Sequence, residues 1–534
     1  MILGSPLSQK TVVAGGRITL DDLFRAAVAQ RPDELALIDP PDREAFTSGA
    51  PRRLTYAQAD HAVTAIAARL RRDGLERDQV VALQLPNTVE AVLALLGVLR
   101  AGLIASPLPL LWRRADCTAA VIAVGARALI TMGRVGATDH GGLAAAVAAQ
   151  APTLDHVYVF GGAGDGASSL DDALAQDAAA ALAVEIMAAA TLTAFEPDPA
   201  AHAHVAIVTW DVTAAGSTPV ARSHAEVVMA GLEPMLEGRF EPNGTILSSL
   251  CLGSVASIAA TLIPWLLSHA TLALHHPFDP LAMRRQVIDF ACTTAILPGS
   301  LSARAAQAGM FAGSAVRQVV AIWRNPERLA ACPSWQPAWP GLMDVVAFGE
   351  AGLMAASRGA DGRPAGLMPG PARRNRDGGF REGGTQDRGP LLIEAGRTRG
   401  GTLALRGPMV PRFPFPPGAA PALQAAVDAD GFVDTFYPCR VAGGSGALVV
   451  TGPPAGVVSM GGYRFPLARV QQTVSQLEPG AMLAAFPDSL AGQRLAGIAV
   501  RRDAIRAALA ELGFNPLVVD AFRARRGGET RDAA

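Results

Sequence analysis

The sequence predicts an α/β fold: a large N-terminal region of mixed or parallel sheets with helices, followed by a small C-terminal α+β domain. Short apolar stretches alternate with amphipathic segments of helical length, a pattern typical of strands joined by helices into a parallel sheet. Half of the 534 residues are hydrophobic and 17% are charged, which is a globular composition. A chain of this length exceeds one compact core, so we expect two or three domains.

The first elements are indicated by helix caps and by apolar spacing. Thr19-Leu-Asp-Asp begins a helix within 17–35, and Leu54-Thr-Tyr-Ala-Gln leads into a helix over about 57–72. Gly74 ends the second helix, and Pro86-Asn87 opens a third one that ends near Gly102. The strands that we expect between and after these helices are 80–85, 104–108, 128–131, 204–210, 271–275, 293–297 and 345–348.

The apolar stretch Cys251–Leu274 is long enough to raise the question of a membrane span. Because Pro264 and His269 interrupt it, a buried helix followed by a strand at 271–274 is favoured. Residues 366–389 are rich in Gly and Arg and predict a mobile surface loop, and 408–417 is a proline-rich connection.

The last segment, from about 450, predicts a small domain with its own helices and strands. Its expected strands are 463–467, 482–486 and 495–500, and its expected helices are 468–477 and 502–512. We therefore expect an N-terminal domain over 17–450 and a short C-terminal domain over 451–526.

The charge and the cysteines exclude several classes of function. Net charge is −1 and the arginines are scattered, so neither nucleic acid nor an anionic membrane is an expected partner. The N-terminus has no basic segment followed by an apolar core, which argues against a secretory signal and favours a cytoplasmic protein. The cysteines lie far apart and predict free thiols in a reducing compartment. They are Cys117, Cys251, Cys292, Cys332 and Cys439.

Several short motifs occur in a fixed order along the chain. They are Leu85-Pro86-Asn87 with Leu99-Arg-Ala-Gly102, Pro107-Leu-Pro109, Thr402-Leu-Ala-Leu-Arg-Gly-Pro408, Asp430-Gly-Phe-Val-Asp-Thr435 and Ser459-Met-Gly-Gly-Tyr-Arg-Phe-Pro466. Their order resembles that of the adenylate-forming superfamily, which includes acyl-CoA synthetases, luciferases and peptide-synthetase adenylation domains, over about 17–515.

This resemblance implies the fold of these enzymes and their activity. ATP converts a fatty or aryl acid to an acyl-adenylate, and coenzyme A then accepts the acyl group. The implied cofactors are ATP or AMP with Mg²⁺, and the implied partner is a small-molecule carboxylic acid or acyl group. The chain must then cradle a triphosphate, neutralise it with cations, and position the attacking carboxylate.

The phosphate loop of the family reads T-S-G-T-T-G-x-P-K-G. The corresponding segment here runs from Thr209 to His224 and lacks the lysine, so Arg222 is the candidate replacement. Asp211 stands at a small or hydroxyl position, where a carboxylate about 4 Å from a phosphate would cost several kcal/mol unless Mg²⁺ bridges them. Both a phosphate-binding loop and a remodelled structural turn remain open. The candidate nucleotide-binding residues are Thr209, Thr213, Gly216, Ser217 and Thr218.

Two further positions carry the metal and the ribose in the family. Glu350 matches a glutamate associated with Mg²⁺, and its alternative is a solvated carboxylate at a strand end. Gly349 and Val346 stand at the family's Thr and adenine-stacking Tyr positions. Tyr437 occupies the place of the ribose-binding aspartate, and its single phenolic oxygen cannot grip both ribose hydroxyls.

The C-terminal motifs also depart from the family. Gly461, Gly462, Tyr463 and Arg464 match a loop that serves the coenzyme A step. The hinge Gly452-Pro-Pro-Ala-Gly456 lacks the family's Arg and Asp, and its prolines stiffen a place that should rotate.

The terminal catalytic lysine of the family is also absent. The only lysine of the chain is Lys10, and its other 45 basic residues are arginine. Arg and Lys are not interchangeable where a compact ammonium lies between reacting groups. Arg523, Arg525 and Arg526 are the candidate replacements for that lysine, and the alternative is a solvated basic tail that looks truncated.

Two hypotheses follow from these departures. The first is an AMP-forming acyl-CoA ligase with impaired adenylation. The second is a non-catalytic pseudo-ligase that binds a nucleotide, an acyl group or a protein partner. Trp265 and Phe278 either line an acyl pocket or pack in the core.

Overall fold

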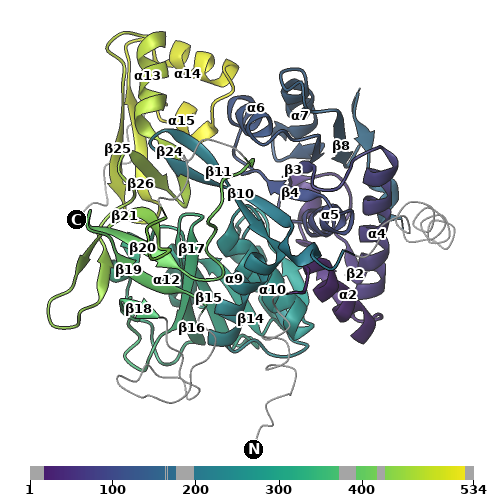
Figure 1. Cartoon of the computed structure of the whole chain (residues 1–534), viewed down its shortest axis with the longest axis horizontal. Helices are drawn as coiled ribbons and strands as arrows, with labels where there is room; N and C mark the ends of the chain where they lie inside the picture. Colours follow the sequence, from purple (N-terminus) through teal and green to yellow (C-terminus); the bar gives the residue numbers. More distant parts are fainter. Residues whose placement is uncertain are drawn as a thin grey trace, which may run out of the picture.

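The computed structural model describes residues 17–162, 164, 166–175, 198–371, 392–417 and 427–523. Two large sheets form the body of the molecule (Figure 1). The eight-stranded sheet has the order β17 (Gly352–Ser357), β16 (Gly341–Phe348), β15 (Gln318–Trp323), β14 (Thr294–Pro298), β12 (Thr245–Ser248), β13 (Thr271–Leu274), β1 (Leu35–Ile38) and β2 (Arg53–Thr55). The seven-stranded sheet has the order β11 (Gly216–Ser223), β10 (Val205–Thr213), β4 (Ile104–Pro107), β3 (Val80–Gln84), β5 (Ala128–Met132), β8 (His156–Phe160) and β9 (Ser168–Ser169).

Both sheets are parallel in their interiors and antiparallel only at edges. In the eight-stranded sheet the antiparallel pairs are β1 with β2 and β16 with β17, and in the seven-stranded sheet the pair is β10 with β11. The α/β class with mixed or parallel sheets is therefore confirmed. A two-stranded ribbon, β6 (Arg134–Val135) with β7 (Thr138–Asp139), lies outside them.

Helices between and around these sheets form three cores. One core joins residues of both sheets with α2 (Leu20–Gln30), α4 (Tyr56–Arg72), α5 (Val89–Arg100), α9 (His224–Glu237) and α10 (Val255–Ser268). A second core packs α6 (Arg114–Ala123) and α7 (His140–Ala148) on the seven-stranded sheet. The third packs α11 (Pro280–Asp289) and α12 (Gly299–Gln307) on the eight-stranded sheet.

Local sequence signals explain the starts of several helices. Thr19 and Thr55 each form a reciprocal capping box at the start of α2 and α4, as their sequences predict. The apolar stretch after Cys251 forms the buried helix α10 and then β13, which confirms the favoured interpretation. Among the described residues, every helix is too short or too polar to cross a bilayer.

A smaller part of the chain forms two further sheets. One has five strands in the order β18 (Gly370–Pro371), β19 (Glu394–Arg397), β20 (Thr402–Arg406), β21 (Val433–Val441) and β22 (Leu448–Val450). The other has four strands in the order β24 (Tyr463–Pro466), β23 (Val457–Met460), β26 (Gly492–Ile498) and β25 (Met482–Asp488).

The four-stranded sheet encloses a core of its own with α13 (Leu467–Leu477), α14 (Arg502–Glu511) and α15 (Pro516–Asp520). We call residues 457–523 the C-terminal unit; it lies at the top of Figure 1, beside β11 and α6. The boundary between 450 and 451 stays a prediction. Residues 372–389 of the predicted surface loop lie outside the described residues, as do Lys10, Arg525 and Arg526.

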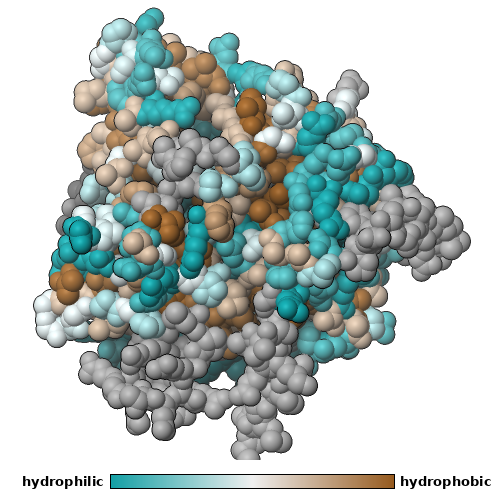
Figure 2. Space-filling model, viewed as in Figure 1, coloured by the Kyte–Doolittle hydropathy of each residue, from teal (hydrophilic) through white to brown (hydrophobic). Residues whose placement is uncertain are grey.

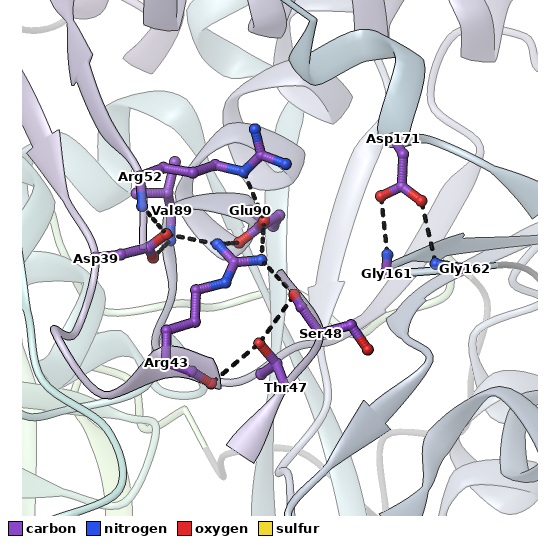
Figure 3. A network of polar contacts seen from close by, with 10 residues as sticks. All are labelled: Asp39, Arg43, Thr47, Ser48, Arg52, Val89, Glu90, Gly161, Gly162 and Asp171. Carbon is purple, nitrogen blue, oxygen red and sulfur yellow. Dashed lines mark hydrogen bonds and ion pairs between the residues drawn. The ribbon is translucent and has the colours of Figure 1, made fainter. Parts of the chain in front are cut away.

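A buried ion network anchors the start of α5, and we call Asp39, Arg43 and Glu90 the core network. Arg43, on the short helix α3 (Arg43–Phe46), donates to Glu90 Oε1 at 2.6 Å and to Asp39 Oδ2 at 2.5 Å. Asp39 also accepts the N–H of Val89 at 2.8 Å, the first residue of α5 (Figure 3). The network thereby ties the end of β1 to the helix that packs beneath the other sheet.

Candidate active site

The candidate site lies at the carboxyl ends of parallel strands in the eight-stranded sheet. β14, β15 and β16 run parallel in adjacent positions, so the segments that follow them meet at one edge. Arg324 follows β15 directly, and Glu350 lies in the turn between β16 and β17. The β10–β11 hairpin and the C-terminal unit cover this edge from the other side (Figure 1).

The segment predicted as a phosphate loop is a β-hairpin. Val212 pairs with Ser217 and Thr213 with Gly216 across a two-residue turn, and the ladder continues to Thr209 opposite Val220. Main-chain groups of this segment are therefore paired across the hairpin and are not gathered into a concave anion nest. Of the two open interpretations, the remodelled structural turn describes the geometry. The nucleotide roles of Thr209, Thr213, Gly216, Ser217 and Thr218 stay predictions.

Asp211 is the centre of the rebuilt site. Its carboxylate pairs with Arg464 Nη1 at 2.7 Å and accepts the N–H of Glu350 at 3.0 Å. A Cβ on Gly349 would lie 2.4 Å from Asp211 Oδ2, and Gly349 has φ 63°. The carboxylate at 211 thus requires glycine at 349, where the family has threonine. These two departures from the family fit each other.

Glu350 and Arg222 are fully buried beside Asp211. Glu350 Oε2 accepts the N–H of Val255 at 2.8 Å, in the first turn of α10, while Oε1 has no hydrogen-bond partner and lies 3.6 Å from Arg324. Burial raises the pKa of Glu350. Arg222 donates to the carbonyl of Glu350 and to that of Met409, so its guanidinium supports the main chain.

The ribose position is filled by protein. The Tyr437 ring meets Phe348 edge-on at 6.3 Å, and its hydroxyl accepts from Arg464 Nη1 at 3.4 Å. Burial raises the pKa of Tyr437 to about 12. Phe436, at the position where the family has glycine, has φ 58°, a left-handed conformation that strains a residue with a side chain. The nucleotide role of Tyr437 stays a prediction.

Arg464 brings the C-terminal unit into the site. Its side chain is 3% exposed. Burial opposes the charge of this guanidinium most strongly, but the acidic groups around it, Asp211 first among them, together outweigh burial and raise the pKa of Arg464. Gly461, Gly462 and Tyr463 line the cavity described below, on the same turn. Their predicted role in a coenzyme A step stays a prediction.

Other contacts hold the C-terminal unit against the hairpin and β15. A Cβ on Gly456 would lie 3.0 Å from the Ala214 Cβ at the hairpin tip. Ser459 Oγ donates to Asn325 Oδ1 at 2.6 Å, and Arg328 donates to the carbonyl of Asp488 at 2.7 Å. Arg523, at the end of the described residues, is exposed, and its replacement of a lysine stays a prediction.

A cavity of about 260 Å³ remains between these parts. Its walls are mainly apolar, and three tryptophans are among them: Trp112, Trp210 and Trp323. Arg324, Asn325, Arg328 and Arg464 contribute its polar side. Figure 2 shows apolar residues gathered on the face where the C-terminal unit meets the rest of the chain. Trp265 lies in the core, stacked on Tyr56 at 6.0 Å, and Phe278 is 42% exposed, so neither lines this cavity.

The residues present do not fit the Mg²⁺ that the family resemblance implies. Within the described part of the chain, no three His, Cys, Asp or Glu side chains gather as a metal site. The two carboxylates, Asp211 and Glu350, already face three guanidiniums, those of Arg222, Arg324 and Arg464. This set carries one net positive charge without a metal, and a dication would add repulsion.

Sequence reasoning missed Arg324, Asn325 and Arg328. The signal was available, because Gln318–Trp323 is an apolar run and the polar residues follow it at a carboxyl end. Cavity walls such as Trp112 and Trp210 carry no such signal, since they come from unrelated segments.

The model of the AMP-binding enzyme family matches residues 24–354, which is more than half of the 534 residues. The chain belongs to this family. The resemblance inferred from the ordered motifs is thus confirmed. Enzymes of this family act on small-molecule acids, and membership is consistent with ATP or AMP as the nucleotide.

Curated relatives match this member of the family over short segments. A salicyl-AMP ligase / salicyl-S-ArCP synthetase of Mycobacterium tuberculosis is 33% identical over 148 residues, which cover 27% of this chain and 25% of the relative. Syringomycin synthase SyrB1 of Pseudomonas syringae pv. syringae is 47% identical over 83 residues, 16% of this chain and 12% of the relative. A beauvericin nonribosomal cyclodepsipeptide synthetase of Beauveria bassiana is 39% identical over 90 residues, 17% of this chain and only 2% of the relative.

Solved structures match nearly the whole chain. The amide bond synthetase McbA of Marinactinospora thermotolerans has a TM-score of 0.66 at 18% identity and covers 94% of both chains. Mycobacterium smegmatis MbtA has a TM-score of 0.61 at 20% identity and covers 97% of this chain and 93% of its own. An anthranilate CoA ligase, AuaEII, in complex with anthranoyl-AMP has a TM-score of 0.58 at 15% identity, covering 93% and 91%. These likenesses establish the fold.

Proposed function

We propose that this member of the AMP-binding family keeps a site for a carboxylic acid or acyl group but adenylates it weakly or not at all. One observation carries the proposal: the phosphate-loop segment is a paired hairpin whose Asp211 is committed to Arg464. A triphosphate placed there would meet a carboxylate and would have to displace a buried guanidinium of the C-terminal unit.

The remaining features support the same conclusion. Tyr437 fills the ribose position, and Arg222 is engaged by main-chain carbonyls. The apolar cavity beside these residues is the part of the site that stays open. Acid recognition is therefore retained more fully than nucleotide recognition.

A second candidate is an active AMP-forming acid–thiol ligase whose cations are arginines. Its support is the family match over 24–354 and the three guanidiniums around Glu350. This reading requires the C-terminal unit to move, so that Asp211 and Arg464 separate and Arg464 or Arg324 faces a phosphate.

Pyrophosphate exchange distinguishes the two candidates. The full chain is incubated with ATP, Mg²⁺, labelled pyrophosphate and a panel of fatty and aryl acids, and thermal unfolding is followed with and without ATP. We expect no acid-dependent exchange and no ATP-dependent rise of the unfolding temperature. Exchange that depends on one acid would favour the ligase, in which case Glu350→Ala should abolish it and Arg222→Ala should weaken it.

A further inference from the structure

Arg324 differs from the other two guanidiniums of the site. Arg464 is 3% exposed and bound to Asp211, and Arg222 is buried against main-chain carbonyls. The Arg324 side chain is 31% exposed and lines the cavity. Its nearest acidic atom, Glu350 Oε1, is 3.6 Å away, and within the described residues its guanidinium makes no hydrogen bond. Apart from this ion pair with Glu350, the N–H donors of the planar fork are therefore available to a ligand.

The main chain and the methylene groups of Arg324 are held in place, although its guanidinium faces the cavity. Arg324 follows the last residue of β15, so its main chain is fixed by the parallel sheet. The turn at Gly462 packs against the stem, because a Cβ on Gly462 would lie 3.4 Å from Arg324 Cβ and Cδ. A guanidinium held in this way loses little further freedom when it binds a carboxylate.

Charge and volume define the ligand that fits. With both carboxylates ionised, Asp211 and Glu350 together with three guanidiniums leave one positive charge uncompensated, which suits an anionic ligand. An engineered cavity of about 150 Å³ in another protein holds benzene. The present volume of about 260 Å³ therefore accommodates one or two fused rings with a carboxylate, and not a long acyl chain. The tryptophans of the wall suit an aromatic body.

We propose that Arg324 is the counter-ion for a compact aromatic monocarboxylate, which the cavity binds without ATP and without Mg²⁺. This inference rests on the proposed function and names its ligand class. In an adenylation reaction the carboxylate attacks a phosphate, whereas here it is anchored by a side chain of the protein. The acid is thus a bound ligand in its free form.

Tryptophan fluorescence tests the proposal directly, since three of the six tryptophans line the cavity. The full chain is titrated in EDTA, without nucleotide, with benzoate, 2-naphthoate, neutral benzamide and palmitate. We expect benzoate and 2-naphthoate to bind at least tenfold more tightly than benzamide, and palmitate to leave the signal unchanged. In Arg324→Gln the affinity for both aromatic acids falls about 10- to 100-fold, while benzamide binding is unchanged, because one charged hydrogen-bonded contact is removed.

Arg304→Gln is the matched control, because Arg304 is an exposed arginine near Ser489 that does not line the cavity. Arg324→Lys keeps the charge without the fork, and we expect an affinity between those of wild type and Arg324→Gln. Arg324→Lys also provides the test of Arg324 if the Arg324→Gln variant does not fold. Unchanged acid affinity in both Arg324 variants overturns the role of Arg324 while leaving the acid site standing. Absence of acid binding by the wild type overturns the acid-binding half of the proposed function as well, and binding that appears only with ATP and Mg²⁺ supports the active ligase.

Discussion

Two buried networks of arginine and carboxylate differ in how completely they are paired. In the core network, all four carboxylate oxygens of Asp39 and Glu90 accept hydrogen bonds, and all three residues are at most 2% exposed (Figure 3). Arg52 lies 3.5 Å from Glu90 as a second cation, and Arg43 Nε is the one side-chain polar atom of the three residues without a hydrogen-bond partner in the described part of the chain. The site network consists of Asp211, Glu350, Arg222, Arg324 and Arg464. It spans two parts of the chain, borders a cavity, and leaves Glu350 Oε1 and Arg222 Nη1 without hydrogen bonds.

The difference shows that buried charge alone does not mark a functional site. The core network has a structural task, since it joins β1 to α5, and it needs nothing from outside the protein. The site network combines a buried carboxylate oxygen that accepts no hydrogen bond with an adjacent apolar cavity. Such incomplete pairing is costly unless a ligand or water completes it. The following variants test this contrast, from the largest expected effect to the smallest.

Arg43→Met should cause the largest loss of stability. It leaves Asp39 and Glu90 buried and close together, with only the half-buried Arg52 at 3.5 Å from Glu90 as a cation, which costs about 3–5 kcal/mol. Urea unfolding measures the loss. Arg406→Met is a suitable control, since Arg406 is 35% exposed in its pair with Glu394 and its removal should cost less than about 1 kcal/mol. Equal losses in the two variants would contradict a structural role of the core network.

Gly349→Thr should be the most damaging single change in the site network. The new side chain would clash with the Asp211 carboxylate in a left-handed turn, at a cost of about 2–4 kcal/mol. Asp211→Ser alone removes the Arg464 pair, but in the double variant it also relieves the clash. The double variant should therefore lose less than the sum of the two single changes. Additive losses in urea unfolding would show that the two positions are independent.

Arg464→Met should lower the free energy of unfolding by a smaller amount, about 1–3 kcal/mol. The C-terminal unit can separate, so water reaches Asp211, whose carboxylate keeps its hydrogen bond to the Glu350 N–H. Hydrogen exchange should speed up in residues 457–523 and stay slow around Arg43. Arg440→Met, an exposed arginine on β21, is the control. Faster exchange throughout the chain would mean that the unit is not held by this pair.

Glu350→Gln should change the pH dependence of stability. Burial raises the pKa of Glu350 above its ordinary value of 4.5, so the folded protein binds this proton more tightly than the unfolded chain. The wild type therefore loses stability from this group as pH rises from about 4.5 through the raised pKa, and the variant lacks that loss. The free energy of unfolding of the variant relative to wild type should increase between pH 5 and pH 8. A constant difference would show that Glu350 titrates normally.

The sequence predicted the parts of the fold that depend on local signals. Capping residues such as Thr19 and Thr55 predicted their helices, and apolar runs predicted seven strands of the two large sheets: β3, β4, β5, β10, β13, β14 and β16. It also predicted that Asp211 does not suit a phosphate loop. It did not predict the hairpin, because Pro219 and the hydroxyl residues around it are typical of loops. Pro219 is tolerated since β11 is an edge strand.

The partners of Asp211 could not be predicted from the local sequence. Arg464 lies more than 250 positions away and Gly349 more than 130, and only the packing of the C-terminal unit brings them together. Arg324 was missed for the same reason, since its value as a cation depends on a cavity formed by several elements. Motif comparison detects a missing residue, but it does not reveal what has replaced its contacts.

Phe436→Gly should produce the smallest effect, and one of opposite sign. Phe436 has φ 58° and its side chain is 47% exposed, so glycine relieves strain while giving up little apolar burial. Relief of the left-handed strain stabilises the folded state by about 1–2 kcal/mol. The greater freedom of glycine in the unfolded chain offsets part of this, so we expect the free energy of unfolding to rise by about 0.5–1 kcal/mol. Phe436→Ala is the control, because alanine keeps the strain and should not stabilise. If alanine stabilises as much as glycine, the gain comes from removing an exposed ring. A gain confined to glycine would show that the left-handed backbone at Phe436 stores strain that only a residue without a side chain relieves.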